Sequence, residues 1–129
     1  MSNFITDTHA LIWYLVGSSR LGSEARAHFD SAVEGESQIF IPAIVVAELI
    51  MFGEKHKTIA PDKIFTKLRE TPGFEFLPLL PETAEAIQPL TALSDIHDRL
   101  IVAEAMAQNM PLLSFDRSIT KSKLVKVIW

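Results

Sequence analysis

The chain has 129 residues, 48% of them hydrophobic, so residues 1–129 can bury one core as a single domain without disulfides or structural metal ions. It contains no cysteine, which excludes a disulfide framework, a thiolate zinc site and a cysteine nucleophile and suits a reducing cytoplasm. No apolar stretch approaches the ~20 residues that a bilayer requires, and no basic leader precedes one. We therefore expect a soluble, unprocessed cytoplasmic protein that does not contact a membrane.

The formal net charge of -4 is unusual for a protein that binds a polyanion. If four candidate metal-binding carboxylates are set aside from the 16 acidic residues, the remaining acids equal the 12 Lys and Arg in number. Basic residues gather at 55–57 and again near the end of the chain, at Arg117, Lys121, Lys123 and Lys126. They can contact phosphates locally, and an ordinary solvated surface is the alternative interpretation.

Strand and helix patterns alternate through the first half of the chain. The predicted elements are a strand at 4–6, a helix at 10–16 ended by Gly17, a helix at 23–33, a strand at 38–41 and a helix from 43 to about 52. Pro42 ends the second strand and is well placed to open the helix that follows.

The same alternation continues in the second half. The predicted elements are an amphipathic helix at 61–70, a strand at 74–79 behind the Pro72-Gly73 turn, helices at 81–93 and 97–109, and strands at 112–115 and 124–128. Such alternation with short connections predicts an α/β fold with three α/β/α layers and a mainly parallel sheet of four to five strands.

Two acidic residues directly follow predicted strands. Asp7 comes after the first strand and Asp116 after the strand at 112–115. Open α/β sheets bind ligands at the carboxyl ends of their strands, so both carboxylates can face one crevice. Whether their strands are neighbours cannot be read from the sequence.

Three of the four candidate acids have an ordinary structural explanation when taken singly. Asp7 can cap the helix that follows it, Asp98 suits a helix dipole, and Asp116 can open a turn or pair with Arg117. Glu48 is harder to explain, because its helix is apolar nearly all round and a buried carboxylate is costly unless paired or bound to a cation. An exposed stripe near Lys55 is the alternative for Glu48.

The order of the four acids is more informative than any one of them. Oxygen-only clusters suit Mg²⁺ or Mn²⁺, which prefer carboxylate and water. Two such ions ~3.5–4 Å apart can activate a water and stabilise the leaving oxygen of a phosphodiester. The sequence therefore indicates a metal site built from Asp7, Glu48, Asp98 and Asp116.

Four segments carry a resemblance to a known family. They are Asp7-Thr8-His9-Ala10-Leu11, Val46-Ala47-Glu48-Leu49, residues 95–103 from Asp95 to Ala103, and Pro111-Leu112-Leu113-Ser114-Phe115-Asp116. Together and in this order they resemble the PIN-domain ribonucleases, and most of all the VapC toxins of toxin-antitoxin pairs. The match covers almost the whole chain, although Ser114 stands where family members often carry Thr.

The resemblance implies a PIN-like fold, a Mg²⁺- or Mn²⁺-dependent endoribonuclease, an RNA substrate, a homodimer and a cognate antitoxin. It implies that Asp7, Glu48, Asp98 and Asp116 are the acidic quartet, supported by the hydroxyls of Thr8 and Ser114. Asp95 is a fifth acid close to Asp98, and N-capping is its expected role. A housekeeping RNA-processing nuclease and a catalytically weak RNA- or protein-binding module remain open as alternatives.

Other chemistries fit the sequence less well. His97-Asp98 is the pair used by HD-type phosphohydrolases, but these need further histidines on an all-helical scaffold, so His97 is expected at the surface or helix start. His9 is expected to be a hydrogen-bonded structural imidazole. A receiver-like site would need paired acids near the first strand. No Gly-rich phosphate loop or serine elbow is present.

Exposed-looking apolar residues suggest an interface with a second copy or an inhibitor. They are Trp13, Tyr14, Met51 and Phe52, with core packing as the default explanation. Because Phe52 precedes Gly53 near the end of the Glu48 helix, we expect this end of the helix to help form an antitoxin groove.

Overall fold

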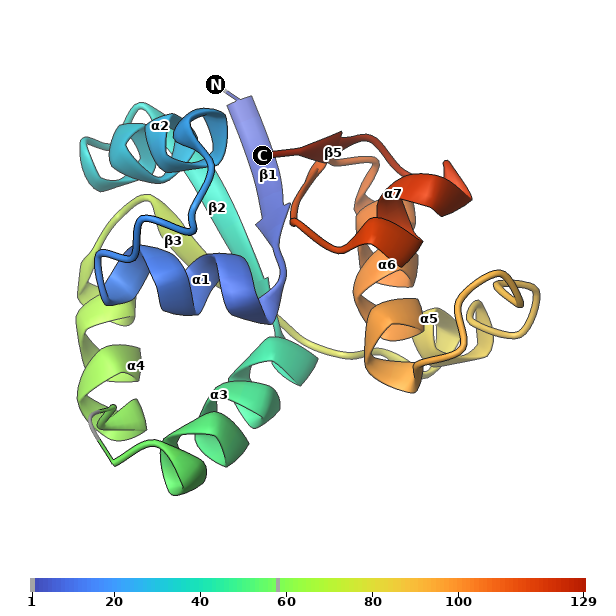
Figure 1. Cartoon of the computed structure of the whole chain (residues 1–129), viewed down its shortest axis with the longest axis horizontal. Coiled ribbons are helices and arrows are strands. Elements are labelled where there is room, and N and C mark those ends of the chain that lie inside the picture. The colour runs from blue at the N-terminus through green and yellow to red at the C-terminus, as the bar shows by residue number, and fades with distance from the viewer. Residues whose placement is uncertain (1, 58) are drawn as a thin grey trace.

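A five-stranded parallel sheet forms the centre of the protein. The structure is a computed structural model that describes residues 2–57 and 59–129. The strands are β1 (Ser2–Thr6), β2 (Ser37–Pro42), β3 (Phe74–Leu77), β4 (Leu112–Leu113) and β5 (Val127–Ile128). They lie in the order β3-β2-β1-β4-β5, and every neighbouring pair is parallel (Figure 1). The predicted mainly parallel sheet is confirmed.

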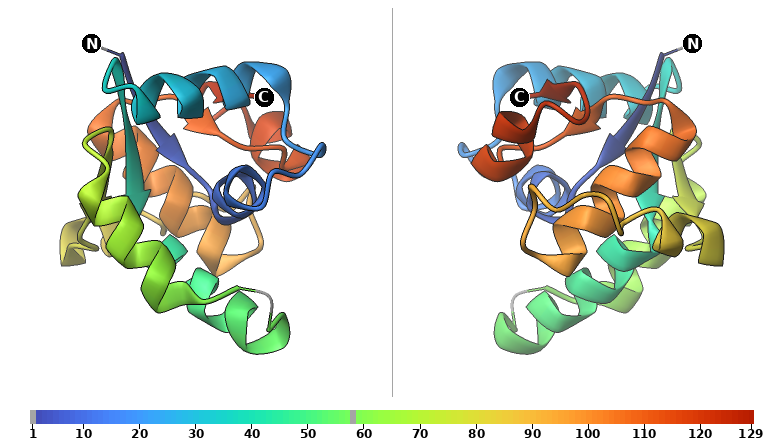
Figure 2. Two further views of the ribbon diagram at one scale, coloured as in Figure 1. Left: turned by 90° about the vertical axis from the view of Figure 1, so that its left-hand side faces the viewer. Right: turned by 90° about the vertical axis from the view of Figure 1, so that its right-hand side faces the viewer.

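Helices cover both faces of this sheet. They are α1 (Thr8–Leu15), α2 (Ser23–Val33), α3 (Ala43–Lys55), α4 (Pro61–Glu70), α5 (Pro81–Glu85), α6 (Ile96–Gln108) and α7 (Arg117–Ser122). Helices α1 and α2 lie on one side of β1 and α6 lies on the other (Figure 2). The predicted three-layer α/β/α arrangement is therefore confirmed.

The core is apolar on both sides of the sheet. Ile5 and Leu112 are register partners on β1 and β4, and both are completely buried. On the β2–β3 side, Phe29 of α2 stacks on Phe74 of β3 with ring centroids 6.3 Å apart. Continuous burial of this kind explains why the strands read as apolar runs in the sequence.

The predicted helix over 81–93 is wrong, because α5 ends at Glu85. The chain continues in tighter turns, in which Ile87 N donates to Ala84 O and Gln88 N donates to Glu85 O. Pro89 has no N–H to donate and its ring clashes with the carbonyl four residues earlier, so an α-helix cannot pass through this point. The missing turns leave a short loop before α6.

The strands at the end of the sheet are shorter than predicted. β3 stops at Leu77, because Pro78 cannot donate to a ladder. β4 stops at Leu113 and β5 covers only Val127–Ile128, so the expected strands over 112–115 and 124–128 are too long. A short helix, α7, fills part of the intervening segment and was not predicted. It begins directly after Asp116.

Three of the four residues expected at an interface instead pack against the core. Trp13, Tyr14 and Phe52 are half-buried, while Met51 is 57% exposed. Among the helices in residues 2–57 and 59–129, none combines the length and the apolar character needed to cross a membrane.

Candidate active site

Asp7 lies where β1 ends and α1 begins. Its Oδ1 accepts a hydrogen bond from the Ala10 backbone at 2.9 Å, so the expected N-cap is present. The side chain is only 9% exposed. Burial raises the pKa of Asp7 from 3.8 to about 6, although hydrogen bonds from Ser114 and Ala10 oppose that rise. A carboxylate desolvated to this degree favours either a proton or a cation.

Asp116 occupies the equivalent position after β4. Because β4 pairs directly with β1, and Asp7 N donates to Leu113 O at 3.1 Å, the ends of the two strands lie side by side. Asp116 Oδ1 accepts from Ile119 N at 2.9 Å and caps α7, while Asp116 N donates to Ser114 Oγ at 3.0 Å. No ion pair joins Asp116 to Arg117 in the part of the chain that the structure describes.

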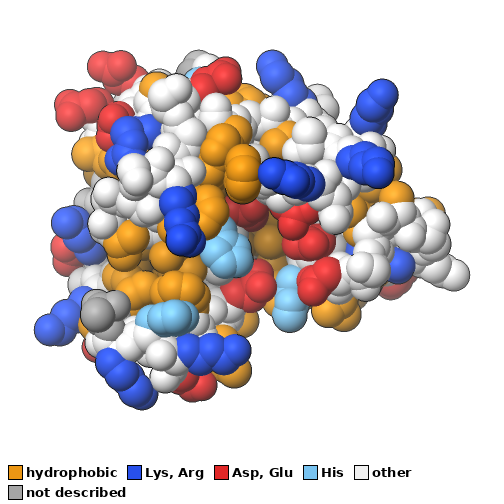
Figure 3. All heavy atoms as spheres, in the orientation of Figure 1, with side chains coloured by type: hydrophobic (Ala, Val, Ile, Leu, Met, Phe, Trp, Pro, Cys, Tyr) orange, Lys and Arg blue, Asp and Glu red, His pale blue; other side chains and the backbone are white. Residues whose placement is uncertain are grey.

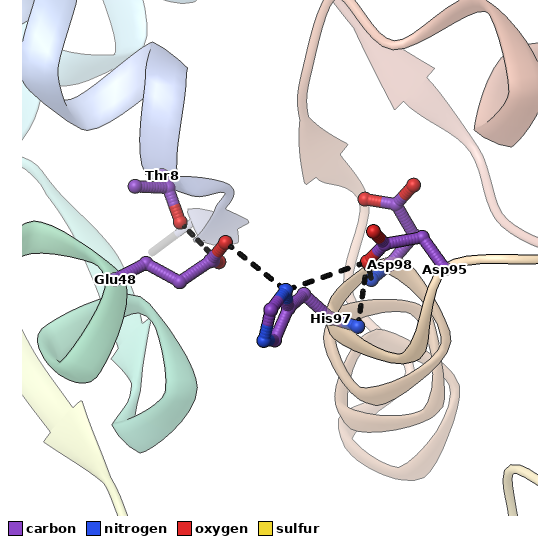
Figure 4. A network of polar contacts seen from close by, with 5 residues as sticks. All are labelled: Thr8, Glu48, Asp95, His97 and Asp98. Atoms are coloured by element: carbon purple, nitrogen blue, oxygen red, sulfur yellow. Dashed lines mark hydrogen bonds and ion pairs between the residues drawn. The ribbon is translucent and has the colours of Figure 1, made fainter. Parts of the chain in front are cut away.

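Glu48 reaches the same place from α3, and its surroundings differ from the expectation. Its side chain is 28% exposed rather than buried. Helix α3 is not buried all round, since Ile50 and Met51 are exposed as well. Thr8 Oγ1 donates a 2.6 Å hydrogen bond to Glu48 Oε1 (Figure 4). The first residue of α1 therefore orients a carboxylate that lies 40 positions away in the sequence.

The first turn of α6 contributes two further acids. Asp95 is the N-cap, as expected, and its Oδ1 accepts from His97 N at 2.7 Å and from Asp98 N at 3.2 Å. The pKa of Asp98 rises to about 6, first through burial and then through repulsion from Asp116, Asp95, Asp7 and Glu48. This repulsion shows that acids from four separate elements share one electrostatic environment.

Together these side chains line one open pocket of about 430 Å³. Its lining residues are Asp7, Thr8, His9, Trp13, Glu48, Asp95, His97, Asp98, Ile101, Phe115 and Asp116. Acidic side chains gather in this hollow, with Lys and Arg side chains on the surrounding surface (Figure 3). Ser114, which is 1% exposed, hydrogen-bonds both Asp116 and Asp7 and so helps to fix these two lining residues.

The acids converge without forming a closed cage. Among residues 2–57 and 59–129, no three His, Asp or Glu side chains are close enough together to hold one ion without moving. Glu48 is held by Thr8 and faces His97 across the pocket (Figure 4). Mg²⁺ commonly keeps several waters and binds one or two carboxylates plus a substrate phosphate, so an open arrangement of oxygen ligands fits this cation.

His97 lies in the first turn of α6 and is 46% exposed, as expected, and it also lines the pocket, which was not expected. Its Nδ1 lies 3.6 Å from Glu48 Oε2 and 3.5 Å from Asp95 Oδ1, so it bridges α3 and α6. His9 is exposed and lies beside Trp13, with ring centroids 5.6 Å apart, which contradicts the expected structural imidazole. The position of His97 one residue before Asp98 is the signal that could have placed it at the site.

A comparison of the sequence with models of protein families identifies the family of this chain. A model of the PIN domain matches residues 4–123, which is most of the chain. The chain belongs to the PIN-domain family. No curated protein sequence matches this PIN domain.

Solved structures agree with this fold. A chain of VapBC2 from Rickettsia felis, bound to a DNA fragment from its promoter, superposes with a TM-score of 0.71 at 16% identity, covering 98% of this chain and 97% of that chain. VapC20 from Mycobacterium tuberculosis, a sarcin-ricin loop cleaving toxin, gives 0.70 at 13% identity, covering 96% and 98%. FitAcB from Neisseria gonorrhoeae gives 0.67 at 18%, covering 98% and 96%. At these identities the likeness concerns the PIN fold.

Proposed function

We propose that this PIN domain is a metal-dependent endoribonuclease in which Asp7, Glu48, Asp98 and Asp116 hold Mg²⁺ or Mn²⁺. One observation carries the proposal. Four carboxylates from β1, α3, α6 and the end of β4 line one pocket, and their mutual repulsion contributes to the raised pKa of Asp98. A divalent cation would remove that repulsion and hold a phosphodiester against the same surface.

The residues of the pocket fit such a cation. All four are oxygen ligands, which hard cations prefer. A bound ion would lower the pKa of the attacking water and stabilise the leaving oxygen, so that cleavage leaves 5′-phosphate and 3′-hydroxyl ends. Asp7 and Asp116 each use Oδ1 as a helix cap, which fixes the carboxylate and leaves further lone pairs for a cation.

Residues around the quartet orient it. Thr8 fixes one oxygen of Glu48, and Ser114 hydrogen-bonds both Asp7 and the backbone of Asp116. Asp95 holds the first turn of α6 and with it the position of Asp98. Supporting partners of this kind set the geometry of metal ligands.

The test is RNA cleavage by the purified protein, freed of any partner, with Mn²⁺, Mg²⁺ or EDTA. We expect cleavage with either metal and none in EDTA, and we expect Asp98→Asn and Asp7→Asn to reduce the rate at least ~100-fold. Asp62→Asn on the exposed face of α4 is the matched control. Calorimetry with Mn²⁺ alone gives an independent result, because the variants should also lose metal affinity. Variants that cut as fast as the unmodified protein would show that the site is wrongly assigned.

We also propose that the protein is the toxin of a toxin-antitoxin pair, that it forms a homodimer and that it acts on cytoplasmic RNA. The structural neighbours that are VapBC and FitAB complexes support this assignment. A mostly apolar groove of about 370 Å³ beside the acidic pocket is lined in part by Ile44, Ala47, Met51 and Phe52, and an antitoxin segment can lie there.

A short reading frame next to the gene should encode the antitoxin. Its product should block RNA cleavage, and Met51→Lys should weaken the block while leaving cleavage itself intact. A chain that is harmless when expressed alone and whose neighbour has no effect on cleavage would instead indicate a housekeeping nuclease.

A second function has one observation in its favour. Because no three ligands in the described residues are assembled for one ion, a weakly catalytic module that binds RNA is the alternative. It predicts RNA binding that persists unchanged in EDTA and no product in Mn²⁺. The calorimetric titration and the cleavage assay separate the two functions.

A further inference from the structure

Three aromatic side chains, Phe115, Trp129 and Trp13, form one cluster beside the acidic pocket, which we call the aromatic wall. Phe115 and Trp129 lie with ring centroids 5.2 Å apart, and Trp129 meets Trp13 edge to face at 5.6 Å. Phe115 and Trp13 both line the pocket that holds the four carboxylates. Two of the three rings of the wall therefore lie in the same cavity as the candidate metal ligands.

The exposure of Phe115 is unusual for its position. It stands between Ser114, 1% exposed, and Asp116, yet the Phe115 side chain itself is 52% exposed. Every other phenylalanine of the protein is half-buried or fully buried. An exposed aromatic ring costs solvation free energy, so a ring held open beside a catalytic pocket points to a ligand that covers it.

Trp129 also packs against the start of α2. Trp129 is anchored against Gly22, where a Cβ atom would come within 2.3 Å of the Trp129 backbone carbon. The guanidinium of Arg20 lies 5.9 Å from the centroid of the Trp13 ring. The wall thus offers the flat aromatic surface on which proteins stack the bases of single-stranded nucleic acid, while Arg20 and Trp13 line a neighbouring pocket that is separate from the acidic one.

We propose that the aromatic wall stacks an unpaired base of the RNA next to the phosphodiester that is cut, with Phe115 as the main contact. Bases inside a duplex already stack on one another and cannot offer a face to Phe115, so the stacked base must be unpaired. This inference rests on the proposed ribonuclease function and adds a base-stacking residue, Phe115, to its site.

An exposed phenylalanine can also mark a protein interface. Here the exposed ring opens into the carboxylate pocket, where a polyanion held through cations is the expected ligand. A base beside a held phosphate therefore explains the position of Phe115 better than a second protein surface does. The experiment includes the protein interface as an outcome that would overturn the proposal.

The experiment measures RNA binding in an Asp98→Asn background with Mn²⁺ in excess, so that cleavage is lost while the cation still occupies the weakened site. The probes are a short mixed-sequence single strand carrying 2-aminopurine, whose fluorescence is quenched by stacking, and the same strand paired with its complement. Phe115→Ala and Phe115→Leu should weaken binding of the single strand by about 5-fold or more and relieve the quenching. Phe115→Trp should preserve both, and duplex binding should stay the same.

Two controls make the result specific. Phe115→Leu keeps apolar bulk but removes the aromatic face, and Met106→Ala changes a residue on α6 that is 47% exposed and does not line the pocket. Equal thermal midpoints of the variants show that the fold is kept. Unchanged binding by Phe115→Leu overturns the proposal, as does an equal loss on single strand and duplex or a changed oligomeric state without a change in RNA binding.

The two proposals fail differently. If the unmodified protein cuts no RNA in Mn²⁺ while Phe115→Leu still loses single-strand binding, the nuclease assignment fails and the stacking site stands. If the unmodified protein cuts RNA and Phe115→Leu cuts single strands with an unchanged KM, the stacking proposal alone is wrong.

Discussion

Asp7 shows how one buried residue links function to stability. Its pKa of about 6 in the folded protein exceeds the ordinary value of 3.8, so between these two pH values the folded state binds more protons than the unfolded state. The free energy of unfolding of the metal-free protein should therefore fall as pH rises through this window and stay lower above pH 6. A buried negative charge is kept at the expense of stability.

The first prediction removes that charge. Asp7→Asn keeps a side chain that can cap α1, so the metal-free variant should be more stable than the unmodified protein at pH 8, by roughly 1–3 kcal/mol. At pH 3.5 most of the difference should be gone, because Asp7 is then protonated in the folded state and mostly protonated in the unfolded state. Urea unfolding in EDTA at the two pH values measures this, with Asp62→Asn as the exposed control. Equal stability at pH 8 would mean that Asp7 is not desolvated.

The second prediction concerns the protons that the carboxylates release when a metal ion binds. Asp7 and Asp98, each with a pKa of about 6, must both be ionised to bind a cation. Mn²⁺ affinity should therefore rise steeply between pH 5 and pH 7, with ~1–2 protons released per binding event at pH 5.5. Calorimetry in two buffers of different ionisation enthalpy counts these protons. Affinity that is flat across this range would place the metal elsewhere.

The third prediction tests the hydroxyl that orients Glu48. Thr8→Val removes the 2.6 Å hydrogen bond while keeping the shape of the side chain, and it should weaken metal affinity or kcat by ~10- to 100-fold. Thr8→Ser keeps the donor and should restore most of the loss. If Val and Ser behave alike, packing rather than the hydrogen bond explains the role of Thr8.

At the scale of elements, the N-cap of α6 positions Asp98, one of the proposed metal ligands. Asp95 accepts from both His97 and Asp98, so Asp95→Ala should cost ~1 kcal/mol of stability and reduce RNA cleavage by displacing Asp98. Asp95→Asn can still cap the helix and should retain activity. Loss of metal affinity in Asp95→Asn, with stability intact, would instead make Asp95 a metal ligand. Chemical denaturation and Mn²⁺ titration of both variants distinguish these roles.

The elements that could be predicted are those with strong local signals. The first half of the fold could be predicted from the strand patterns of β1 and β2 and from Gly17 and Pro42, which end predicted elements. The prediction of a helix over 81–93 was wrong. Its apolar spacing is typical of a helix, but Pro89 breaks the helical turn that precedes it. Helix α7 was missed because six residues carry too little periodicity to be recognised.

At the scale of the whole molecule, the order of the acids along the chain predicted which residues would meet. The adjacency of β1 and β4 could not be predicted, because strand order depends on packing between distant segments rather than on local sequence. The contact of His97 with Glu48 could not be predicted for the same reason. Its partner Glu48 lies on another helix, and the sequence offers no sign that α3 and α6 face each other across the pocket.

The fifth prediction concerns the contact that joins the loop before α2 to the end of the chain. Gly22→Ala forces a Cβ into the backbone of Trp129, so it should destabilise the protein by ~1–3 kcal/mol and shift its tryptophan fluorescence. Gly35→Ala is a useful comparison: its Cβ would meet nothing within 4 Å, so any loss there reflects only its positive φ. An unperturbed spectrum in Gly22→Ala would show that Trp129 can move away freely.

The placement of β1 between β2 and β4 has a consequence for the cell that makes this protein. Asp7 and Glu48 leave the ribosome early, but β4, α6 and Asp116 follow only when most of the chain has been synthesised. A nascent or truncated chain therefore carries half of the carboxylates and none of the second wall of the pocket. For the nuclease proposed above, RNA cleavage should therefore begin only when translation is nearly complete.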